Sequence, residues 1–364
     1  MKVLFFIESL QSGGKERRLV ELIKGFNKQY SNLECEVVIM NPKIHYKEVY
    51  DLKLKIHILE RGRLKKDPSI FYKFYTICKQ AKPDLINVWG NMAAFYSIFS
   101  KVLLKIPIVN NQITDVPFNF KRSIISHKVT FMFSDLILAN SEAGVKAYKP
   151  PLEKTKIIYN GFDFNRIKDL KSKEEIKKEL KINTRYTAGM VASFSHLKDY
   201  ETFINAAILM LSEDKDITFI CVGSGEKDKY KNMIPLKWFN NFRFLEARND
   251  IESIMNICDI GVLTSNGEGT SNALIEFMAL GKPILSTNLG GTPELIKDNF
   301  NGFLLEPKNP TQLAENIMTL LNKKDVYDSI SKNNIHDVKV RFSIDRMIQE
   351  FYNAYESILK KCAA

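Results

Sequence analysis

The feature that most limits the possible folds is a regular alternation of short β-rich runs with helical stretches along the whole chain. The strand candidates of the first half are Lys2–Ile7, Glu36–Met40, Leu54–Ile58, Asp84–Val88, Ile106–Asn110, Leu136–Asn140 and Thr155–Ile158. Those of the second half are Thr187–Val191, Ile217–Val222, Phe242–Leu245, Ile260–Thr264, Pro283–Thr287 and Phe303–Leu305. Helical patterns fill the intervals, among them Arg17–Asn27, Tyr200–Ser212, Lys227–Met233, Ile251–Met255, Ala273–Leu280 and Pro310–Leu321. Such alternation is typical of βαβ units, in which a parallel sheet carries helices on both faces.

The length of the chain favours two such sheets. It has 364 residues, and domains commonly hold roughly 100–200 residues each. The sequence Asn-Gly-Phe-Asp at Asn160–Asp163, followed by a highly charged stretch to Lys181, marks the joint. We therefore predict an α/β fold of two Rossmann-like domains, residues 1–164 and 165–343, that face each other across a cleft. The last helix, within residues 344–364, is expected to pack back on the first domain.

Composition excludes several classes of protein. Apolar residues make up 45% of the chain and charged residues 26%, which is the range of globular proteins rather than of disordered chains. The five cysteines are scattered and never form a CxxC pair, so we expect a reducing compartment and neither a disulfide framework nor a zinc site. The apolar start at Met1–Ile7 is short and is expected to be a buried strand, not a signal peptide. No run of about 18 apolar residues suggests a membrane span. We expect a cytoplasmic protein.

The positive charge lies in one half. Residues 1–164 hold 26 Lys and Arg against 15 Asp and Glu, whereas residues 165–364 hold 27 of each. This asymmetry indicates a first half that meets an anionic partner, or merely a lysine-rich composition. Basic and apolar residues mix in Phe118–Phe133, and Lys101 and Lys105 interrupt another apolar stretch. Such mixtures suit peripheral contact with an anionic bilayer, although core aromatics beside a solvated basic face are the alternative.

The most informative stretch is Thr264–Thr287, TSNGEGTSNALIEFMALGKPILST. It predicts a strand end, a polar loop, a short helix, a stop and a second strand. Ser271 or Asn272 suits the helix N-cap, and Gly281 lies where a glycine often follows a helix. Pro283 then opens the next strand.

Two glutamates in this stretch are eight positions apart, Glu268 and Glu276. Even along a continuous helix they would be about 12 Å apart, whereas the carboxyl pair of a glycoside hydrolase lies roughly 5–9.5 Å apart. We therefore expect them to hold two parts of one extended ligand. The backbone amides of Gly269, Thr270, Ser271 and Asn272 lie between them at a helix N-terminus, which favours an anion. A sugar, then phosphates, then a ribose would fit.

This stretch, GEGTSNALIEFMALGKPIL, resembles the EX7E signature of the family 4 retaining glycosyltransferases, which have the GT-B fold. Further landmarks of that family follow in its order. They are SLQSGGKE at Ser9–Glu16, ANSEA at Ala139–Ala143, IIYNGFD at Ile157–Asp163, VASFSHLKDYETFI at Val191–Ile204, VGSGE at Val222–Glu226 and LGGTPELI at Leu289–Ile296. The resemblance spans nearly the whole chain, and its strength lies in the order of motifs that are weak one by one.

The resemblance implies a role for each matched residue. Glu276 would accept hydrogen bonds from the ribose of the donor nucleotide, and Glu268 would bind hydroxyls of the transferred sugar. Lys198 would contact the diphosphate, where a fixed cation stabilises the charge that develops on the leaving group. Glu268 and Lys198 are therefore the candidate catalytic residues. Gly14 would lie close to the donor phosphates or the sugar, and Gly223 close to the nucleotide.

The chain departs from the family pattern at one donor-binding position. Members commonly carry an arginine as a second phosphate cation five residues before the lysine, and Ser193 occupies that place here. Arg248 and His196 are the nearest candidates to replace it by motif. Arg248 is also expected beside the base, with a surface role as the alternative.

The acceptor side is less defined. Many members have a histidine near the strand ends of the first domain, where this chain has Trp89-Gly90-Asn91 and Asn110-Asn111-Gln112. Asn91 and Asp115 are the candidate acceptor contacts. The isolated histidines predict no metal site, and we expect neither a metal nor another cofactor beside the nucleotide-sugar co-substrate.

The resemblance thus implies a retaining glycosyltransferase that moves a sugar from a nucleotide donor, with UDP as the expected base, to a glycan or lipid-linked glycan in cell-surface polysaccharide or glycoconjugate synthesis. A nucleotide-sugar epimerase on the same architecture is the alternative, although the EX7E pattern favours transfer. A nucleic-acid-binding protein is disfavoured, because no DNA- or RNA-reading motif accompanies the basic first half.

Overall fold

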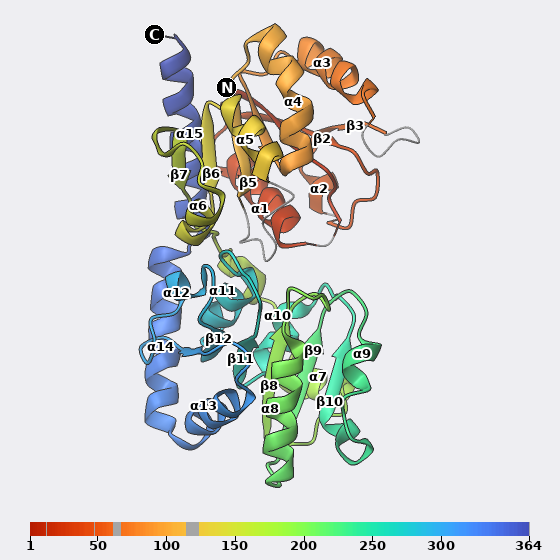
Figure 1. The fold of residues 1–364 in the computed structure, drawn as a ribbon, viewed down its shortest axis with the longest axis vertical. Coiled ribbons are helices and arrows are strands. Elements are labelled where there is room, and N and C mark those ends of the chain that lie inside the picture. Colours follow the sequence, from red (N-terminus) through yellow and green to blue (C-terminus); the bar gives the residue numbers. More distant parts are fainter. Residues whose placement is uncertain (12, 47, 61–66, 114–123, 364) are drawn as a thin grey trace. The chain divides into compact units, whose positions relative to one another are not determined.

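The computed structural model describes residues 1–363 except 12, 47, 61–66 and 114–123. The chain divides into two compact units (Figure 1). The first domain comprises Met1–Gly161 and Ile344–Ala364, and the second comprises Phe162–Ser343. The division thus falls after Gly161, a little before the position predicted after Phe164.

The described part of the first domain contains a seven-stranded parallel sheet with the strand order β3-β2-β1-β4-β5-β6-β7. Its strands are β1 (Lys2–Ile7), β2 (Glu34–Ile39), β3 (Lys55–Ile58), β4 (Leu85–Trp89), β5 (Ile108–Ile113), β6 (Leu136–Ala139) and β7 (Thr155–Ile157). Its helices are α1 (Gly14–Gln29), α2 (Glu48–Asp51), α3 (Ser69–Ala81), α4 (Asn91–Leu104), α5 (Ile124–Met132), α6 (Glu142–Tyr148), the 3-10 turn η1 (Leu152–Lys154) and α15 (Ile344–Ala363). From the middle of the sheet, the strands follow in chain order outward from β1 to β3 on one side and from β4 to β7 on the other. The order therefore reverses between β1 and β4.

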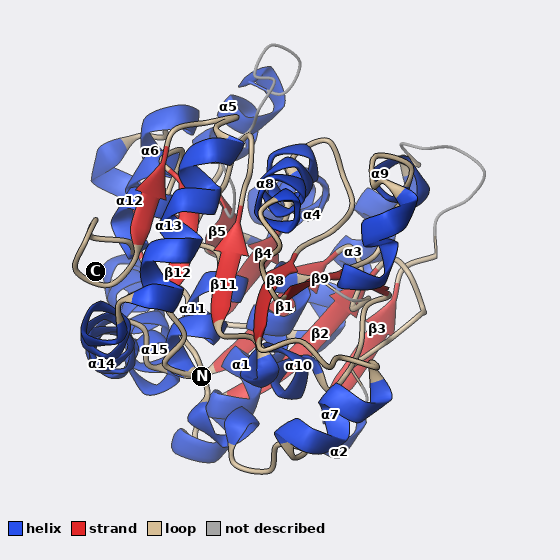
Figure 2. Ribbon diagram, turned by 90° about the horizontal axis from the view of Figure 1, so that it is seen from below, coloured by secondary structure: helices blue, strands red, loops and turns tan. Residues whose placement is uncertain are grey.

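The second domain has a six-stranded parallel sheet in its described residues, with the order β10-β9-β8-β11-β12-β13. Its strands β9, β8, β11 and β12 are labelled in Figure 2. Its strands are β8 (Tyr186–Val191), β9 (Ile217–Val222), β10 (Phe242–Leu245), β11 (Ile260–Leu263), β12 (Ile284–Thr287) and β13 (Phe303–Leu305). Its helical elements are η2 (Phe164–Ile167), α7 (Lys173–Glu179), α8 (Tyr200–Ser212), α9 (Asp228–Lys231), η3 (Leu236–Asn241), α10 (Ile251–Ile257), α11 (Asn272–Ala279), α12 (Thr292–Leu295), α13 (Pro310–Asn322) and α14 (Lys324–Arg341). Both sheets are therefore the parallel α/β sheets that the alternation predicts.

The largest error in a predicted strand end concerns β5. The strand predicted as Ile106–Asn110 continues to Ile113, where the side-chain amides of Asn110 and Gln112 are buried and donate to α5 and the turn that follows it. The Asn110 amide donates to Ser134 Oγ at 3.0 Å, and the Gln112 amide donates to Thr130 Oγ1 at 2.9 Å. A polar run that reads as a loop can thus form a strand when a neighbouring helix supplies hydrogen-bond partners.

The C-terminal helix α15 packs on α1 and completes the core of the first domain. Gly25 of α1 lies against Ile348, and a Cβ at this position would collide with the isoleucine side chain. Phe351 stacks on Trp89 at the end of β4, with ring centroids 6.1 Å apart. The Tyr355 hydroxyl donates to Asn87 Oδ1 at 2.9 Å.

Two glycines of the second sheet permit close packing of the helices on the strands. A Cβ at Gly261 of β11 would meet the ring of Phe277 on α11, and one at Gly189 of β8 would meet the sulfur of Cys258, which follows α10. Phe277 is fully buried, so Gly261 limits the depth at which α11 lies on the sheet. That helix carries Glu276.

The strand order of the second sheet reverses between β8 and β11. In open parallel sheets, the loops that follow the two strands at such a reversal diverge and leave room for a ligand. These loops are residues 192–199 after β8 and 264–271 after β11. No helix in the described part of the chain is both long and apolar enough to cross a membrane.

Lys282 generates a prediction about the stability of the second domain. It lies between α11 and β12, and its Nζ donates to the Asn256 carbonyl at 2.7 Å. Burial lowers the pKa of this lysine from 10.5 to about 8. Between these pH values the unfolded chain binds more protons than the folded one, so the Lys282 contribution to the free energy of unfolding must rise with pH.

Wild type and Lys282→Met should therefore differ by an amount that grows by about 2–3 kcal/mol between pH 8 and 10.5 in favour of the wild type. Urea unfolding of both proteins at several pH values measures this difference. Parallel pH dependences of the two proteins would contradict the prediction.

Candidate functional site

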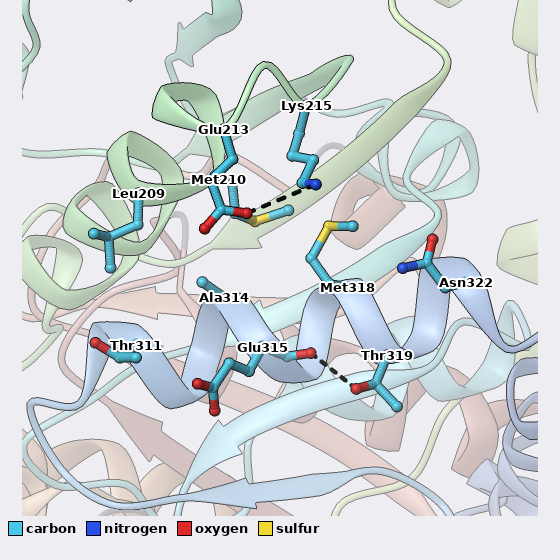
Figure 3. A pocket seen from close by; sticks show the side chains of 10 residues that line it. All are labelled: Leu209, Met210, Glu213, Lys215, Thr311, Ala314, Glu315, Met318, Thr319 and Asn322. Carbon is cyan, nitrogen blue, oxygen red and sulfur yellow. Dashed lines mark hydrogen bonds and ion pairs between the residues drawn. The ribbon is translucent and has the colours of Figure 1, made fainter.

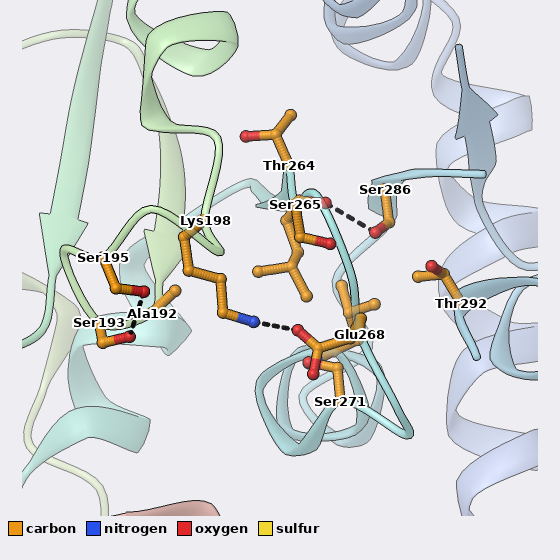
Figure 4. A network of polar contacts seen from close by, with 12 residues as sticks. Ala192, Ser193, Ser195, Lys198, Thr264, Ser265, Glu268, Ser271, Ser286 and Thr292 are labelled. Atoms are coloured by element: carbon orange, nitrogen blue, oxygen red, sulfur yellow. Dashed lines mark hydrogen bonds and ion pairs between the residues drawn. The ribbon is translucent and has the colours of Figure 1, made fainter. Parts of the chain in front are cut away.

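Lys198 and Glu268 meet at the strand reversal of the second domain. Their side chains form an ion pair between Nζ and Oε2 and are 17% and 15% exposed (Figure 4). The backbone also joins the two loops, because Lys198 forms an antiparallel bridge with Ser265. The Asp199 amide donates to the Thr264 carbonyl at 3.1 Å. The two residues, which are 70 positions apart, are thus brought together as the candidate catalytic residues.

The backbone of Glu268 is fixed by the turn that follows β12. The Gly291 amide donates to the Glu268 carbonyl at 2.8 Å. Gly290 has φ +60°, and a Cβ there would collide with the same carbonyl. The motif LGGTPELI therefore has a physical reason for its glycine, which is close contact with the loop that holds the candidate carboxylate.

Helix α11 begins where the sequence indicates. Ser271 is its N-cap, with the hydroxyl accepting from the Leu274 amide at 3.4 Å. Gly281 follows the helix with φ +67°. Gly269 and Thr270 are buried in the loop before it, and Asn272 is half-buried at its start. The carboxyl group of Glu276 lies on this helix, and the residue is only 7% exposed.

Glu276 has partners that the sequence did not indicate. Arg166 of η2 donates from Nη2 to Glu276 Oε1 at 2.6 Å. The same guanidinium donates from Nε to Glu252 Oε1 at 2.9 Å. The only local signals were a charged stretch after the domain joint and a glutamate in the first turn of α10. Neither signal shows that these residues meet Glu276.

Ser193 and Arg248, one of its candidate replacements, contact different residues. Ser193 is exposed, and its hydroxyl lies 3.2 Å from the Ser195 hydroxyl. Arg248 forms ion pairs with Asp250 at 2.8 Å and Glu179 at 2.6 Å. These carboxylates raise the pKa of Arg248, and the guanidinium lowers the pKa of Asp250. Its charge is thus balanced within its own loop and α7, which is the geometry of the surface role left open for it.

Gly223 follows β9 and is explained by packing. A Cβ at this residue would collide with the Ala192 carbonyl. The neighbouring Ala192 amide donates to the Val222 carbonyl at 2.9 Å. Gly223 therefore supports the loop that leads to Lys198.

The first domain holds the remaining candidates. Gly14 is the first residue of α1, directly after Gly13, whose amide donates to the Tyr46 hydroxyl at 3.1 Å. Asn91 begins α4, and its amide donates to Ser126 Oγ at 2.9 Å while its Oδ1 is buried without a partner. Asp115 lies outside the described residues.

A polar hollow of about 550 Å³ lies at the carboxyl ends of β1, β2 and β3. Its lining residues are Glu8, Ser9, Gln11, Met40, Asn41, Pro42 and Glu60. Lys15 forms an ion pair with Glu8 at 2.8 Å. Burial raises the pKa of the neighbouring Glu16 carboxyl. The hollow and its carboxylates were not among the predicted site residues, because their spacing in the sequence shows no pattern.

A second hollow, of about 510 Å³, lies between α8 and α13 of the second domain (Figure 3). Its wall includes Met210, Glu213 and Lys215, at the end of α8 and just before β9. These residues lie at the amino-terminal edge of the sheet, whereas Lys198 and Glu268 lie at the carboxyl edge. Within the described ranges, no group of three or more His, Cys, Asp or Glu side chains could hold a metal ion.

Known proteins resemble the chain in sequence and in fold. Residues 172–337 match the family described as "Glycosyl transferases group 1". HepE from Anabaena, solved in complex with UDP and glucose, superposes with a TM-score of 0.86 at 22% identity, covering 98% of this chain and 100% of that one. Both domains therefore have the fold of the GT-B glycosyltransferases. These matches support a GT-B glycosyltransferase of group 1.

Two relatives align over most of this chain. One is the N,N'-diacetylbacillosaminyl-diphospho-undecaprenol alpha-1,3-N-acetylgalactosaminyltransferase of Campylobacter jejuni, 25% identical over 89% of this chain and 92% of the relative. The other is the UDP-Gal:alpha-D-GlcNAc-diphosphoundecaprenol alpha-1,3-galactosyltransferase of Escherichia coli, 25% identical over 80% and 79%. The matches lend no support to a nucleotide-sugar epimerase.

The contact at Gly290 generates the prediction for this site. Gly290→Ala should lower the free energy of unfolding by about 2 kcal/mol, because an L-residue is strained at positive φ and its Cβ displaces the Glu268 carbonyl. Gly291→Ala is the matched control, since Gly291 has φ −86°. Urea unfolding of both variants checks the difference, and equal stabilities would contradict it.

Proposed function

We propose that this glycosyltransferase transfers a sugar from a nucleotide donor, with UDP as the base, to a lipid-linked glycan with retention of configuration. The observation that carries the proposal is the Lys198–Glu268 pair at the strand reversal of the second sheet, on the loops that flank buried Glu276. UDP occurs in the HepE complex and UDP-galactose in the name of the Escherichia coli relative, and both support this choice of base.

Lys198 and Glu268 would exchange their present contact for contacts with the donor. Lys198 would leave Glu268 for the diphosphate, and Glu268 would then accept hydrogen bonds from hydroxyls of the transferred sugar. Glu276 would accept from the ribose. A cation and helix-end amides that are already in place stabilise developing negative charge without reorganisation. The amides of Gly269–Asn272 would add to Lys198 in this role.

In the proposed reaction, the bond between the anomeric carbon and the diphosphate oxygen breaks, and its electron pair leaves with the nucleotide. The acceptor hydroxyl forms the new bond on the same face of the sugar and gives its proton to the departing diphosphate. Protein groups alone would balance the charge, so we propose that no metal takes part.

We also propose that the acceptor is reached at an anionic membrane surface by peripheral contact, on the inner face of the membrane. Both relatives carry diphospho-undecaprenol glycans in their names, and such lipids lie in a bilayer. Within the stretch Phe118–Phe133, residues 118–123 lie outside the described residues. Phe131 is buried against Ile113 and Ile137, as the alternative of core aromatics expects. Lys101 is paired with Asp135 at 2.6 Å.

A different surface of the first domain supports the membrane proposal. Helices α3 and α4 pack against each other, and outward-facing apolar side chains lie on both. Tyr72, Phe95, Phe99, Val102 and Leu103 are each at least 39% exposed. We call these five residues the α3–α4 surface. Exposed aromatic and aliphatic groups gathered in this way are typical of a surface that contacts a partner.

The charges around the α3–α4 surface favour an anionic bilayer as that partner. Neither helix contains an aspartate or glutamate. Lys73, Lys79 and Lys105 are exposed on or directly after these helices. Apolar groups flanked by lysines suit the boundary between headgroups and acyl chains.

The donor proposal is tested by thermal unfolding with UDP, GDP, ADP, CMP and NAD, each with and without EDTA. UDP should raise the melting temperature, because a ligand present at about 100 times its Kd stabilises the native state by about 2.7 kcal/mol. Glu276→Ala should abolish this shift, and EDTA should leave it unchanged. Glu201→Ala is the control, as an exposed glutamate of the same domain. No shift with any diphosphate, or a shift with NAD alone, would refute the donor proposal.

The membrane proposal is tested by co-sedimentation with vesicles of phosphatidylglycerol and phosphatidylethanolamine. Binding should fall as salt rises, and Lys105→Glu should weaken it at least about fivefold, because each lysine near the surface contributes about 1 kcal/mol. Phe99→Ser should also weaken it. Leu236→Ser, which removes an exposed leucine from the second domain, is the control. Equal binding by all variants, or equal binding to neutral phosphatidylcholine vesicles, would contradict the proposal.

A further inference from the structure

Arg166 joins two buried carboxylates of the second domain. Its Nε and Nη2 both donate to Glu252 Oε1, and Nη2 also donates to Glu276 Oε1 at 2.6 Å. The arginine side chain is 17% exposed, and each glutamate side chain is 9% exposed. The guanidinium also lies over the ring of Phe162, 5.0 Å from its centroid. The group is therefore held by contacts on several sides.

The guanidinium makes two hydrogen bonds to Glu252 and one to Glu276. This difference indicates which glutamate holds the arginine and which one the arginine orients. Two donors of the fork are directed at Glu252 on α10, which fixes the plane of the guanidinium. An arginine fork held in this way presents a further contact in a defined direction. One such contact is with Glu276 on α11. Glu252 thus anchors the arginine, and the arginine orients Glu276.

We propose that Arg166 is a positioning residue of the donor site, which sets the orientation of the Glu276 carboxylate for the ribose hydroxyls. This inference rests on the proposed function. Arg166 need not touch the donor, because it acts through Glu276. Its planar fork contacts both glutamates at once, whereas a lysine would supply a single point charge.

The proposal predicts which kinetic constant changes. The ribose lies away from the bond that breaks, so its contacts are the same in the ground state and in the transition state. Loss of such a contact raises KM and leaves kcat nearly unchanged. Lys198 contrasts with this, because its contact with the departing diphosphate strengthens as charge develops, and its loss lowers kcat.

The experiment measures the affinity of UDP by titration calorimetry for wild type, Arg166→Met, Arg166→Lys, Glu276→Gln and the double variant Arg166→Met/Glu276→Gln. Arg166→Met should bind UDP about tenfold more weakly, as expected for one charge-assisted hydrogen bond. In the Glu276→Gln background the same substitution should add little, because its effect passes through that carboxylate. Arg166→Lys should fall between wild type and Arg166→Met.

The matched control is Arg341→Lys. Arg341 is also an ion-paired arginine of the second domain, bonded to Asp337 at 3.2 Å and to the Glu294 carbonyl at 2.6 Å. The Arg341→Lys variant should bind UDP as the wild type does. Melting temperatures of all variants separate a loss of affinity from a loss of folding.

The outcomes distinguish this inference from the function on which it rests. If the wild type binds no UDP or other nucleoside diphosphate, the proposed function fails and the inference fails with it. If the wild type binds UDP and Arg166→Met binds it equally well, the inference alone is overturned. The inference would also be overturned if Arg166→Met lowered the affinity for UDP as much in the Glu276→Gln background as in the wild type, since Arg166 would then act by another route. If Arg166→Met does not fold, wild-type affinity in folded Arg166→Lys would overturn the inference.

Discussion

Parallel strands are the constraint on which the rest of this structure depends. Every strand in a parallel sheet ends at the same edge, so the loops that follow the neighbouring strands β8 and β11 leave the sheet at the same edge. The order reverses between these two strands, and their loops diverge there. Lys198 and Glu268 lie on these loops, and their ion pair spans the reversal. Helix α11, whose close approach Gly261 permits, carries Glu276.

A second constraint is that charges with little exposure need partners. Lys198 is paired with Glu268, and Arg166 with both Glu252 and Glu276. Removing one member of a partly buried pair leaves the other charge uncompensated, which is costly in a medium of low dielectric. A diphosphate can relieve this cost at Lys198 by replacing Glu268. The Lys198–Glu268 pair is therefore suited to exchange with a charged ligand.

Local sequence signals predicted most elements because they depend on neighbouring residues. The strands Ile217–Val222 and Phe242–Leu245 and the helix Tyr200–Ser212 have the predicted bounds. The predicted strand through Asn110 ends too early, since the amides of Asn110 and Gln112 donate to residues about twenty positions away. The sequence left open whether Phe131 is a surface or a core aromatic, because its basic neighbours are close in sequence, whereas its packing partners lie on β5 and β6.

The sequence by itself determined the alternation of strands and helices, the caps of α11 and the order of motifs that leads to Glu268, Glu276 and Lys198. Periodicity and capping act over a few residues, so they are visible in the sequence. Only the tertiary structure decided which charges meet. Arg166 contacts Glu252 and Glu276 across 86 and 110 positions of chain, and Arg248 turns instead to Asp250 and Glu179. Such pairings follow from how helices lie on the sheet, because electrostatic partners are chosen by distance in space and not along the chain.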